Sequence, residues 1–203
     1  MTKSADPLKG GGRLRWAPPL RGHSTGVCCL GMELRTQRLL LRPWRRGDEA
    51  ALVAHANHRD VWINLADIFP HPYREADAHE WIGRVEADES GSLHLAIVRG
   101  EEPVGGIGVV RLLGIDRFTG NLGYWLGPTA WGHGYATEAV RALADYAFGE
   151  TDLERLQARV YEWNPASCRV LEKAGFTQEA CLRRAAFKDG RLIDVWLYSR
   201  VRG

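Results

Sequence analysis

The sequence predicts an α+β domain on a mixed, mostly antiparallel sheet, with one parallel strand pair near its middle and flanking helices. Two observations predict this class. An apolar strand at residues 121–126 runs through a glycine-broken turn into an amphipathic helix at residues 134–148, and another strand follows at residues 156–161. Because a helix joins these two strands, they are expected to be parallel, with a right-handed crossover. The other expected strands are separated by Gly, Asp and Pro turns.

Five elements are expected before this junction. They are a strand at 38–42, a helix at 48–57, a helix at 77–85, and strands at 94–98 and 104–113. Pro43 ends the first strand, and Asp48 caps the first helix. The second helix has apolar residues at i, i+3, i+4 and i+7 spacing. Between the two helices lies an aromatic, proline-rich connection, residues 62–73, which is too apolar to be a free linker.

Three elements are expected after the crossover. They are a helix at 164–175 and strands at 177–186 and 192–201. Asn164 caps the helix, Pro165 takes its first position and Gly175 ends it. The sequence Lys188-Asp189-Gly190 predicts a hairpin turn between the last two strands.

The composition favours one domain and excludes two classes of partner. With 203 residues, 45% apolar side chains and eight tryptophans, one sizeable core is expected within residues 32–203. Lys and Arg number 27 against 25 Asp and Glu, and this near balance argues against a dedicated nucleic-acid binder. The sequence has no uninterrupted run of about 18 apolar residues, so no membrane span is predicted.

The cysteines and the first residues complete this picture. The four cysteines lack metal-type spacing and no histidine cluster accompanies them, so no metal is expected. Two of them, Cys28 and Cys29, are adjacent, which a reduced, cytoplasmic chain explains most simply. Residues 1–31 hold glycine and proline runs without a sustained apolar period and are expected to be a loosely ordered extension. Met32 is a candidate for the natural start, because the patterned sequence begins directly after it.

The turn at Gly132-His133-Gly134 is the strongest indication of function. A strand-turn-helix junction directs several unpaired backbone N–H groups and the positive end of a helix dipole at one small region, where a pyrophosphate would fit. A P-loop would need a lysine after the last glycine, and none is there. A Rossmann fingerprint would need a third glycine, which is missing. A tight loop that merely starts a helix is the other reading of these glycines.

Several motifs, taken together, resemble those of the GNAT acyltransferases. They are residues 123–126, 131–139, 164–167 and 172–176, with residues 34–43 matching the branch that includes bacterial acetyltransferases of ribosomal-protein N-termini. The resemblance spans residue 33 to the C-terminus. It implies a GNAT-like sheet in which the two central parallel strands splay apart, with acetyl-CoA as co-substrate. In that family the pantetheine arm enters the gap between these strands.

The resemblance also implies roles for individual residues. The backbone N–H of Leu126 would polarise the thioester carbonyl, Asn164 would hydrogen-bond the pantetheine arm, and Ser167 would supply a proton to the departing sulfur. Asn164 is also a favoured helix cap, and the two roles can coexist. Many GNAT enzymes carry a tyrosine acid at the position of Glu172, and its absence shifts that role to Ser167. The residues expected to bind the co-substrate are Tyr124, Trp125, Leu126, Trp131, Gly132, His133, Gly134, Tyr135, Ala136, Thr137, Asn164 and Arg169.

The acceptor side is defined less well by the sequence. By resemblance, the connection at 62–73 covers the acceptor pocket, and the expected substrate residues are Trp62, Phe69, His71, Tyr73 and Asp194. Core packing would equally explain the aromatic ones, and an ordinary strand-end hydrogen bond would explain Asp194. Relatives often have a carboxylate at the positions of Asn121 and Ala186, so no general base is evident.

The expected function is therefore a cytoplasmic N-acetyltransferase that uses acetyl-CoA, in which an amine attacks the thioester directly. A protein or peptide N-terminus is the favoured acceptor, because an α-amine with a pKa of about 7.7–8.0 is partly neutral without a base, whereas a lysine near 10.4 is not. Two alternatives stay open: the same chemistry on a polyamine, amino acid or antibiotic, and a catalytically silent acyl-CoA sensor. The sequence does not distinguish a monomer from a homodimer.

Overall fold

The computed structural model describes residues 32–203. The extension expected at residues 1–31 lies outside the described residues. In chain order the elements are β1 (Leu34–Arg35), β2 (Leu40–Pro43), α1 (Glu49–Ala56), α2 (Arg59–Trp62), α3 (Glu75–Glu86), β3 (Leu93–Arg99), β4 (Glu102–Arg111), the 3-10 turn η1 (Gly114–Asp116), β5 (Thr119–Leu126), the 3-10 turn η2 (Pro128–Ala130), α4 (Tyr135–Glu150), β6 (Arg155–Tyr161), α5 (Pro165–Lys173), β7 (Thr177–Lys188) and β8 (Arg191–Val201).

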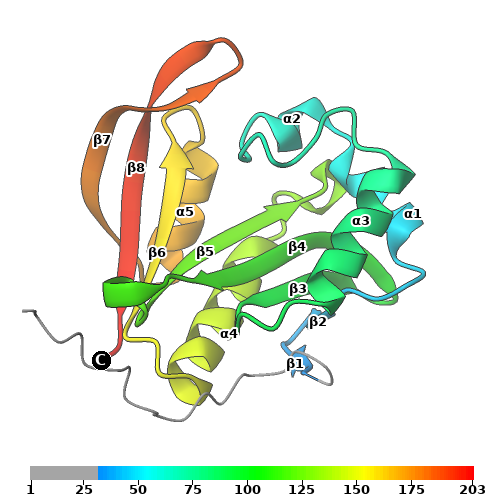
Figure 1. The fold of residues 1–203 in the computed structure, drawn as a ribbon, viewed down its shortest axis with the longest axis horizontal. Coiled ribbons are helices and arrows are strands. Elements are labelled where there is room, and N and C mark those ends of the chain that lie inside the picture. The colour runs from blue at the N-terminus through cyan, green and yellow to red at the C-terminus, as the bar shows by residue number, and fades with distance from the viewer. Residues whose placement is uncertain (1–31) are drawn as a thin grey trace, which may run out of the picture.

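One eight-stranded sheet runs through the described part of the chain, in the order β1-β2-β3-β4-β5-β6-β8-β7 (Figure 1). Its neighbours are antiparallel except for β5 and β6, which are parallel and joined through α4. The predicted fold class, including the position of the parallel pair, is therefore confirmed.

The sheet separates two apolar clusters, because successive side chains of a strand point to opposite faces. On β3, Leu95 and Ile97 pack into the cluster that holds α4 and the buried side of α5, whereas Ala96 and Val98 pack into the cluster that holds α1 and α3. Helices therefore cover both faces, α1 and α3 on one side and α4 and α5 on the other (Figure 1).

The structure differs from the sequence-based expectation at three places. The two-residue strand β1 and the four-residue helix α2 were not predicted, because neither is long enough to show a hydrophobic period. Asp48 does precede α1, but its carboxylate makes no capping hydrogen bond. It is instead buried with Arg42, whose two terminal nitrogens lie 2.7 and 2.8 Å from its oxygens. A buried guanidinium without a carboxylate would destabilise the fold more than the loss of a helix cap does, so the Asp48 carboxylate pairs with Arg42. The prediction of a side-chain cap was therefore wrong.

The parallel pair is short, and this opens the sheet. Only residues 119–121 of β5 pair with β6, opposite residues 155–157. Beyond them the strands diverge, and β6 leads away from β5 together with β8 and β7 (Figure 1). The second half of β5 is therefore paired with β4 on one edge and unpaired on the other.

Local sequence sets the two helix starts that face this gap. Gly132 and Gly134 both have φ of +78°, a left-handed conformation that costs other residues about 1–2 kcal/mol, and α4 begins at the next residue. At the start of α5, the Oδ1 atom of Asn164 accepts a hydrogen bond from the Ser167 N–H at 3.1 Å, and Pro165 follows as the first helical residue. The predicted cap at Asn164 is confirmed.

Candidate active site between the diverging strands

A cavity of about 730 Å³ occupies the gap between β5 and β6. The second half of β5, the turn before α4, the start of α5, the middle of β6 and the segment that begins with α2 line it. Many of the residues expected to bind the co-substrate line it together, namely Tyr124, Trp125, Leu126, Trp131, Gly132, Gly134, Tyr135, Ala136, Thr137, Asn164 and Arg169. Segments that range from residue 60 to residue 186 thus meet in one hollow.

The turn before α4 presents free hydrogen-bond donors to this cavity. None of the backbone N–H groups of residues 132–137 donates to another residue of the described chain; the first N–H to do so is that of Glu138, which bonds Gly134 O at 3.1 Å. The first N–H groups of a helix lack intrahelical partners and carry the positive end of its dipole. A pyrophosphate group fits such a cradle because its oxygens accept hydrogen bonds and carry negative charge.

The side of the turn away from the cavity is held in place by Arg38. Its guanidinium donates to His133 O at 2.9 Å and to the carboxylate of Glu138 at 2.8 Å, and lies 4.8 Å from the centre of the Tyr135 ring. The side chain of Glu138 also accepts from Thr36 at 2.6 Å. The turn between β1 and β2, which carries Thr36 and Arg38, therefore holds the conformation of the glycine turn from the side away from the cavity.

The unpaired edge of β5 presents Leu126 to the cavity. Gly127 N–H donates to Val104 O on β4 at 2.8 Å, so the alternate residues Leu126 and Tyr124 direct their backbone groups towards β6. The indole Nε1 of Trp131 donates to Leu126 O at 2.7 Å, which satisfies the carbonyl and leaves the adjacent N–H for a ligand. A thioester carbonyl placed along this edge would meet that N–H.

Ser167 and Tyr124 form a hydroxyl pair at the centre of the cavity. The Tyr124 hydroxyl lies 2.7 Å from Ser167 Oγ and 3.2 Å from Ser167 O. Burial raises the pKa of Tyr124 above its usual range, although the hydrogen bond with Ser167 opposes this, so the phenol keeps its proton. When that proton points at Ser167 Oγ, the serine's own hydrogen is free to donate into the cavity.

Another part of the cavity wall is formed by the segment that begins with α2. Asp60, Val61, Asn64, Leu65 and Ala66 line it, and Asp60 is the only acidic residue among the described residues that line the cavity. The Nδ2 group of Asn64 donates to Asp60 O at 2.9 Å. The Oδ1 atom of Asn64 is buried and has no hydrogen-bond partner within residues 32–203.

Comparison with known proteins identifies the family. A family model described as an acetyltransferase (GNAT) domain matches residues 38–177. The chain belongs to the GNAT acetyltransferase family. The uncharacterized N-acetyltransferase p20 of Bacillus licheniformis is 30% identical over 168 residues, which cover 82% of this chain and 94% of that protein. The ribosomal-protein-serine acetyltransferase of Escherichia coli is 31% identical over 105 residues, covering 52% of this chain and 58% of that protein.

Solved GNAT structures share the fold at lower identity. The ribosomal L7/L12 α-N-protein acetyltransferase RimL, solved with coenzyme A, has a TM-score of 0.75 at 21% identity and covers 84% of this chain and 98% of its own. A spermidine N-acetyltransferase from Vibrio cholerae, solved with CoA and spermine, has a TM-score of 0.70 at 22% identity, covering 82% and 97%. The protein is therefore an acetyl-CoA-dependent GNAT acetyltransferase, and the comparisons leave its acceptor open.

The substrate residues expected from the sequence lie outside this cavity's lining. Phe69 and Tyr73 pack against each other and belong to the apolar cluster under α1 and α3, and Phe69 also meets Trp125 edge-on at 5.7 Å. Trp62 and His71 stack on each other at 5.5 Å. Asp194 accepts from the Arg184 N–H at 2.7 Å on the terminal hairpin.

Other expected residues are placed beside the site in different ways. His133 stacks on Tyr135 at 5.4 Å, and its ring does not line the cavity. Arg169 and Lys173 both line it, on the face of α5 that borders the phosphate end. Asn121 accepts from Gln157 Nε2 at 2.9 Å, where the parallel strands part.

The positions of the family's usual acid and base are occupied by residues with other partners or none. Glu172, where many relatives have tyrosine, accepts a hydrogen bond from Tyr198 at 3.0 Å and lies outside the cavity lining. Ala186 lines the cavity but has no titratable group. Sequence reasoning missed Asp60 and Asn64, because α2 is too short to show a hydrophobic period and neither residue belongs to a recognisable motif.

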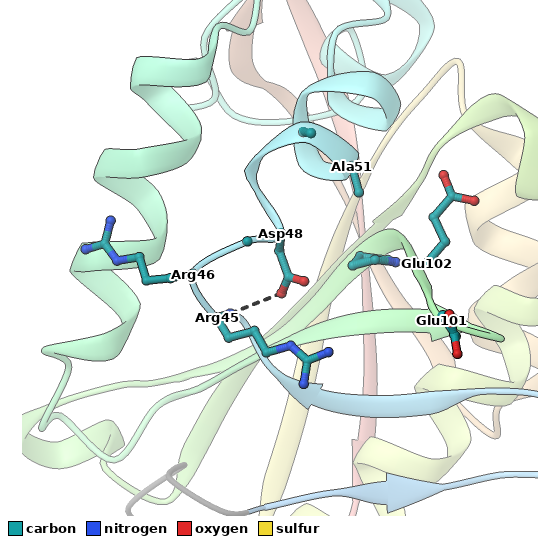
Figure 2. A pocket seen from close by; sticks show the side chains of 9 residues that line it. Arg45, Arg46, Asp48, Ala51, Glu101 and Glu102 are labelled. Carbon is teal, nitrogen blue, oxygen red and sulfur yellow. Dashed lines mark hydrogen bonds between the residues drawn. The ribbon is translucent and has the colours of Figure 1, made fainter.

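A second, open pocket of about 490 Å³ lies between the start of α1 and the β3–β4 turn (Figure 2). Two of its acidic side chains have partners: Asp48 pairs with Arg42, and the carboxylate of Glu102 lies 3.0 Å from His55 Nε2. Figure 2 also shows the hydrogen bond that the Arg45 backbone N–H donates to the Asp48 carboxylate.

Residues 32–203 contain neither a membrane-spanning helix nor a metal-binding cluster. No described helix is both long and apolar enough to span a membrane. Among the same residues, no group of three or more His, Cys, Asp or Glu side chains is arranged to hold a metal ion.

Proposed function

We propose that this GNAT enzyme acetylates the α-amine of a protein or peptide N-terminus in the cytoplasm. The observation that carries the proposal is the charge of the acceptor end, where Asp60 is the only acidic residue lining the cavity within the described chain. A polyamine carries several ammonium groups near neutral pH and would be bound best by several carboxylates. A peptide N-terminus brings a single ammonium group, which one carboxylate can pair.

Relatives support this choice of acceptor. The similar E. coli protein acts on a ribosomal-protein serine by name, and the fold neighbour RimL is an α-N-protein acetyltransferase. The resemblance to this branch implies that Asn121 and Ala186 stand where relatives often carry carboxylates. An α-amine needs less help from a base than a lysine does, because more of it is neutral at pH 7.5.

The geometry supports a direct transfer. Acetyl-CoA supplies the acetyl group as a thioester, and the N–H groups of residues 132–137 fit its pyrophosphate. The Leu126 N–H would donate to the carbonyl oxygen as negative charge develops on it. The neutral amine forms the new C–N bond as the C–S bond breaks, and the Ser167 hydroxyl would donate its proton to the departing sulfur. The proton that the new amide nitrogen loses would pass through solvent and restore the Ser167 hydroxyl, so Tyr124 stays protonated.

Thiol release from acetyl-CoA, measured against a panel of acceptors, tests the proposal. The panel holds peptides with N-terminal Ser, Ala or Met, the same peptides with acetylated N-termini, spermidine, and an aminoglycoside. We expect turnover with the free peptides only. Turnover confined to spermidine or the aminoglycoside would refute the acceptor assignment, and tight acetyl-CoA binding without turnover on any amine would favour a sensor.

The hydroxyl pair is tested by Ser167→Ala and Tyr124→Phe. Alanine keeps the backbone N–H that bonds Asn164, so the helix cap persists and acetyl-CoA affinity should stay near the wild-type value. We expect kcat to fall towards the lower end of the ~100- to 10⁴-fold range of general acids, because a thiolate is a tolerable leaving group. An unchanged kcat in both variants would remove the acid role.

A further inference from the structure

The acceptor end of the cavity contains a buried hydrogen-bond acceptor without a partner. Asn64 Oδ1 is buried and accepts nothing from residues 32–203. Its orientation is settled by the other half of the amide, because Nδ2 donates to Asp60 O at 2.9 Å. A buried carbonyl left without a donor is costly, and because Asn64 lines the cavity, a small shift of its side chain would bring Oδ1 to a donor supplied by a ligand.

A carboxylate stands beside this orphan acceptor. Asp60 lies in α2 and Asn64 lies two residues beyond its end, and the hydrogen bond from Asn64 Nδ2 to Asp60 O holds the two residues together. Both line the cavity, and the Asp60 carboxylate makes no ion pair with any of the cations the structure describes. Together they offer a ligand one negative charge and one neutral oxygen, and no donor.

The segment that carries the two residues is anchored to the terminal hairpin. Arg59 pairs with Asp189 at 2.6 Å. Lys188, which is 1% exposed, pairs with Asp67 at 2.7 Å and lies 3.7 Å from the centre of the Trp62 ring. These contacts bridge the two halves of the diverging sheet, and the hairpin tip leans towards α2 in Figure 1. We call this set of contacts the clasp.

We propose that Asp60 and Asn64 form the subsite that binds the attacking amine of the acceptor, and that the clasp positions it. A primary ammonium has three N–H donors and a positive charge, so Asn64 Oδ1 can accept one hydrogen bond while the Asp60 carboxylate pairs with the charge. The pairing favours an ammonium group over a carboxylate, which the Asp60 charge would repel, and the bound ammonium loses one proton to solvent before its nitrogen attacks. The inference rests on the proposed transfer to an amine.

Steady-state kinetics with a free N-terminal serine peptide test the subsite. Asp60→Asn and Asn64→Leu should each raise the KM for the peptide by about 10- to 100-fold, as expected for the loss of a hydrogen bond to a charged group. The dissociation constant for acetyl-CoA should not change, because neither residue belongs to the phosphate turn. Asp116→Asn, an exposed acid on η1, is the matched control and should leave both constants unchanged.

Lys188→Met tests the clasp, because it removes both the ion pair and the cation-π contact but touches neither subsite residue. Lys188 is a positioning residue, so the peptide KM should rise in this variant while acetyl-CoA affinity holds. A peptide KM unchanged by Asp60→Asn and by Asn64→Leu would overturn the subsite. An equal loss of peptide and acetyl-CoA affinity in these variants would overturn it too, since that marks a general collapse of the cavity.

The outcome is separable from that of the proposed function. If the acceptor panel selects spermidine, the same variants are measured with spermidine as the probe. A raised spermidine KM in Asp60→Asn would support the subsite although the peptide assignment has failed. An unchanged peptide KM, with the peptide still the preferred acceptor, would overturn the subsite alone.

Discussion

Replacement of Gly134 by valine perturbs the turn that would hold the pyrophosphate. Gly134 has φ of +78°, where a residue with a side chain is strained by about 1–2 kcal/mol. An added Cβ would meet only the Arg38 guanidinium, at 3.5 Å, which is ordinary contact. The fold should therefore lose about 1–2 kcal/mol and persist.

The effect on the ligand should be larger than the effect on the fold. Valine strains the left-handed backbone of the turn, and a backbone that relaxes from φ of +78° carries the N–H groups of residues 132–137 out of line with the phosphate oxygens. A hydrogen bond to a charged group contributes about 1.5–3 kcal/mol, so the loss of two such bonds weakens binding by about 3–6 kcal/mol. That corresponds to a rise in Kd of at least about 100-fold.

Calorimetric titration of acetyl-CoA and urea denaturation give the two quantities. Gly100→Val is the matched control, because Gly100 has φ of +64° and nothing within 4 Å of an added Cβ, in the β3–β4 turn away from the cavity. It should lose similar stability and bind acetyl-CoA normally. A Gly134→Val protein that is folded and binds acetyl-CoA within about threefold of the wild type would refute the role of the turn.

Two further predictions concern the supports of the fold. Asp48→Asn should lower the free energy of unfolding by about 3–5 kcal/mol, because it leaves the Arg42 charge buried and unpaired; urea denaturation measures this, and a loss below about 1 kcal/mol would contradict it. Burial acts to raise the pKa of Glu138, but hydrogen bonds from Thr36 and Arg38 outweigh it and hold the pKa below 4.5. Its contribution is thus present above about pH 4.5 and lost as the pH falls through the lower folded-state pKa, so the difference in melting temperature between wild type and Glu138→Gln should shrink from pH 7 to pH 3.5. A difference that does not vary with pH would contradict this account.

The features that the sequence predicted correctly depend on near neighbours in the chain. The cap at Asn164 involves an N–H only three residues away, and the left-handed turn at Gly132 and Gly134 depends on their lack of a Cβ. The parallel pair followed from the helix that joins its two strands. Each of these is a constraint within about one helical turn or one connection.

The errors and omissions concern residues whose role depends on distant partners. Asp48 is of a residue type that favours helix caps, but in the structure its carboxylate pairs with the buried guanidinium of Arg42. Phe69 and Tyr73 are aromatic residues that the sequence could place in a pocket wall or in the core, and in the structure they pack beneath α1 and α3. Aromatic side chains suit both environments, so only the packing distinguishes them.

The sequence by itself determined the strand-turn-helix junction and the capped start of α5, because allowed backbone angles and capping are properties of a few adjacent residues. Its motifs also carried the resemblance to the family to which the chain belongs. Only the tertiary structure decided that Tyr124 meets Ser167, 43 residues away, and that Lys188 reaches Asp67 across 121 residues. It also placed Asp60, on a helix too short to be predicted, and Asn64, just beyond that helix, in the wall of the cavity that the phosphate turn lines. Such contacts form only when the diverging halves of the sheet fold over the same gap, and no local pattern in the chain records them.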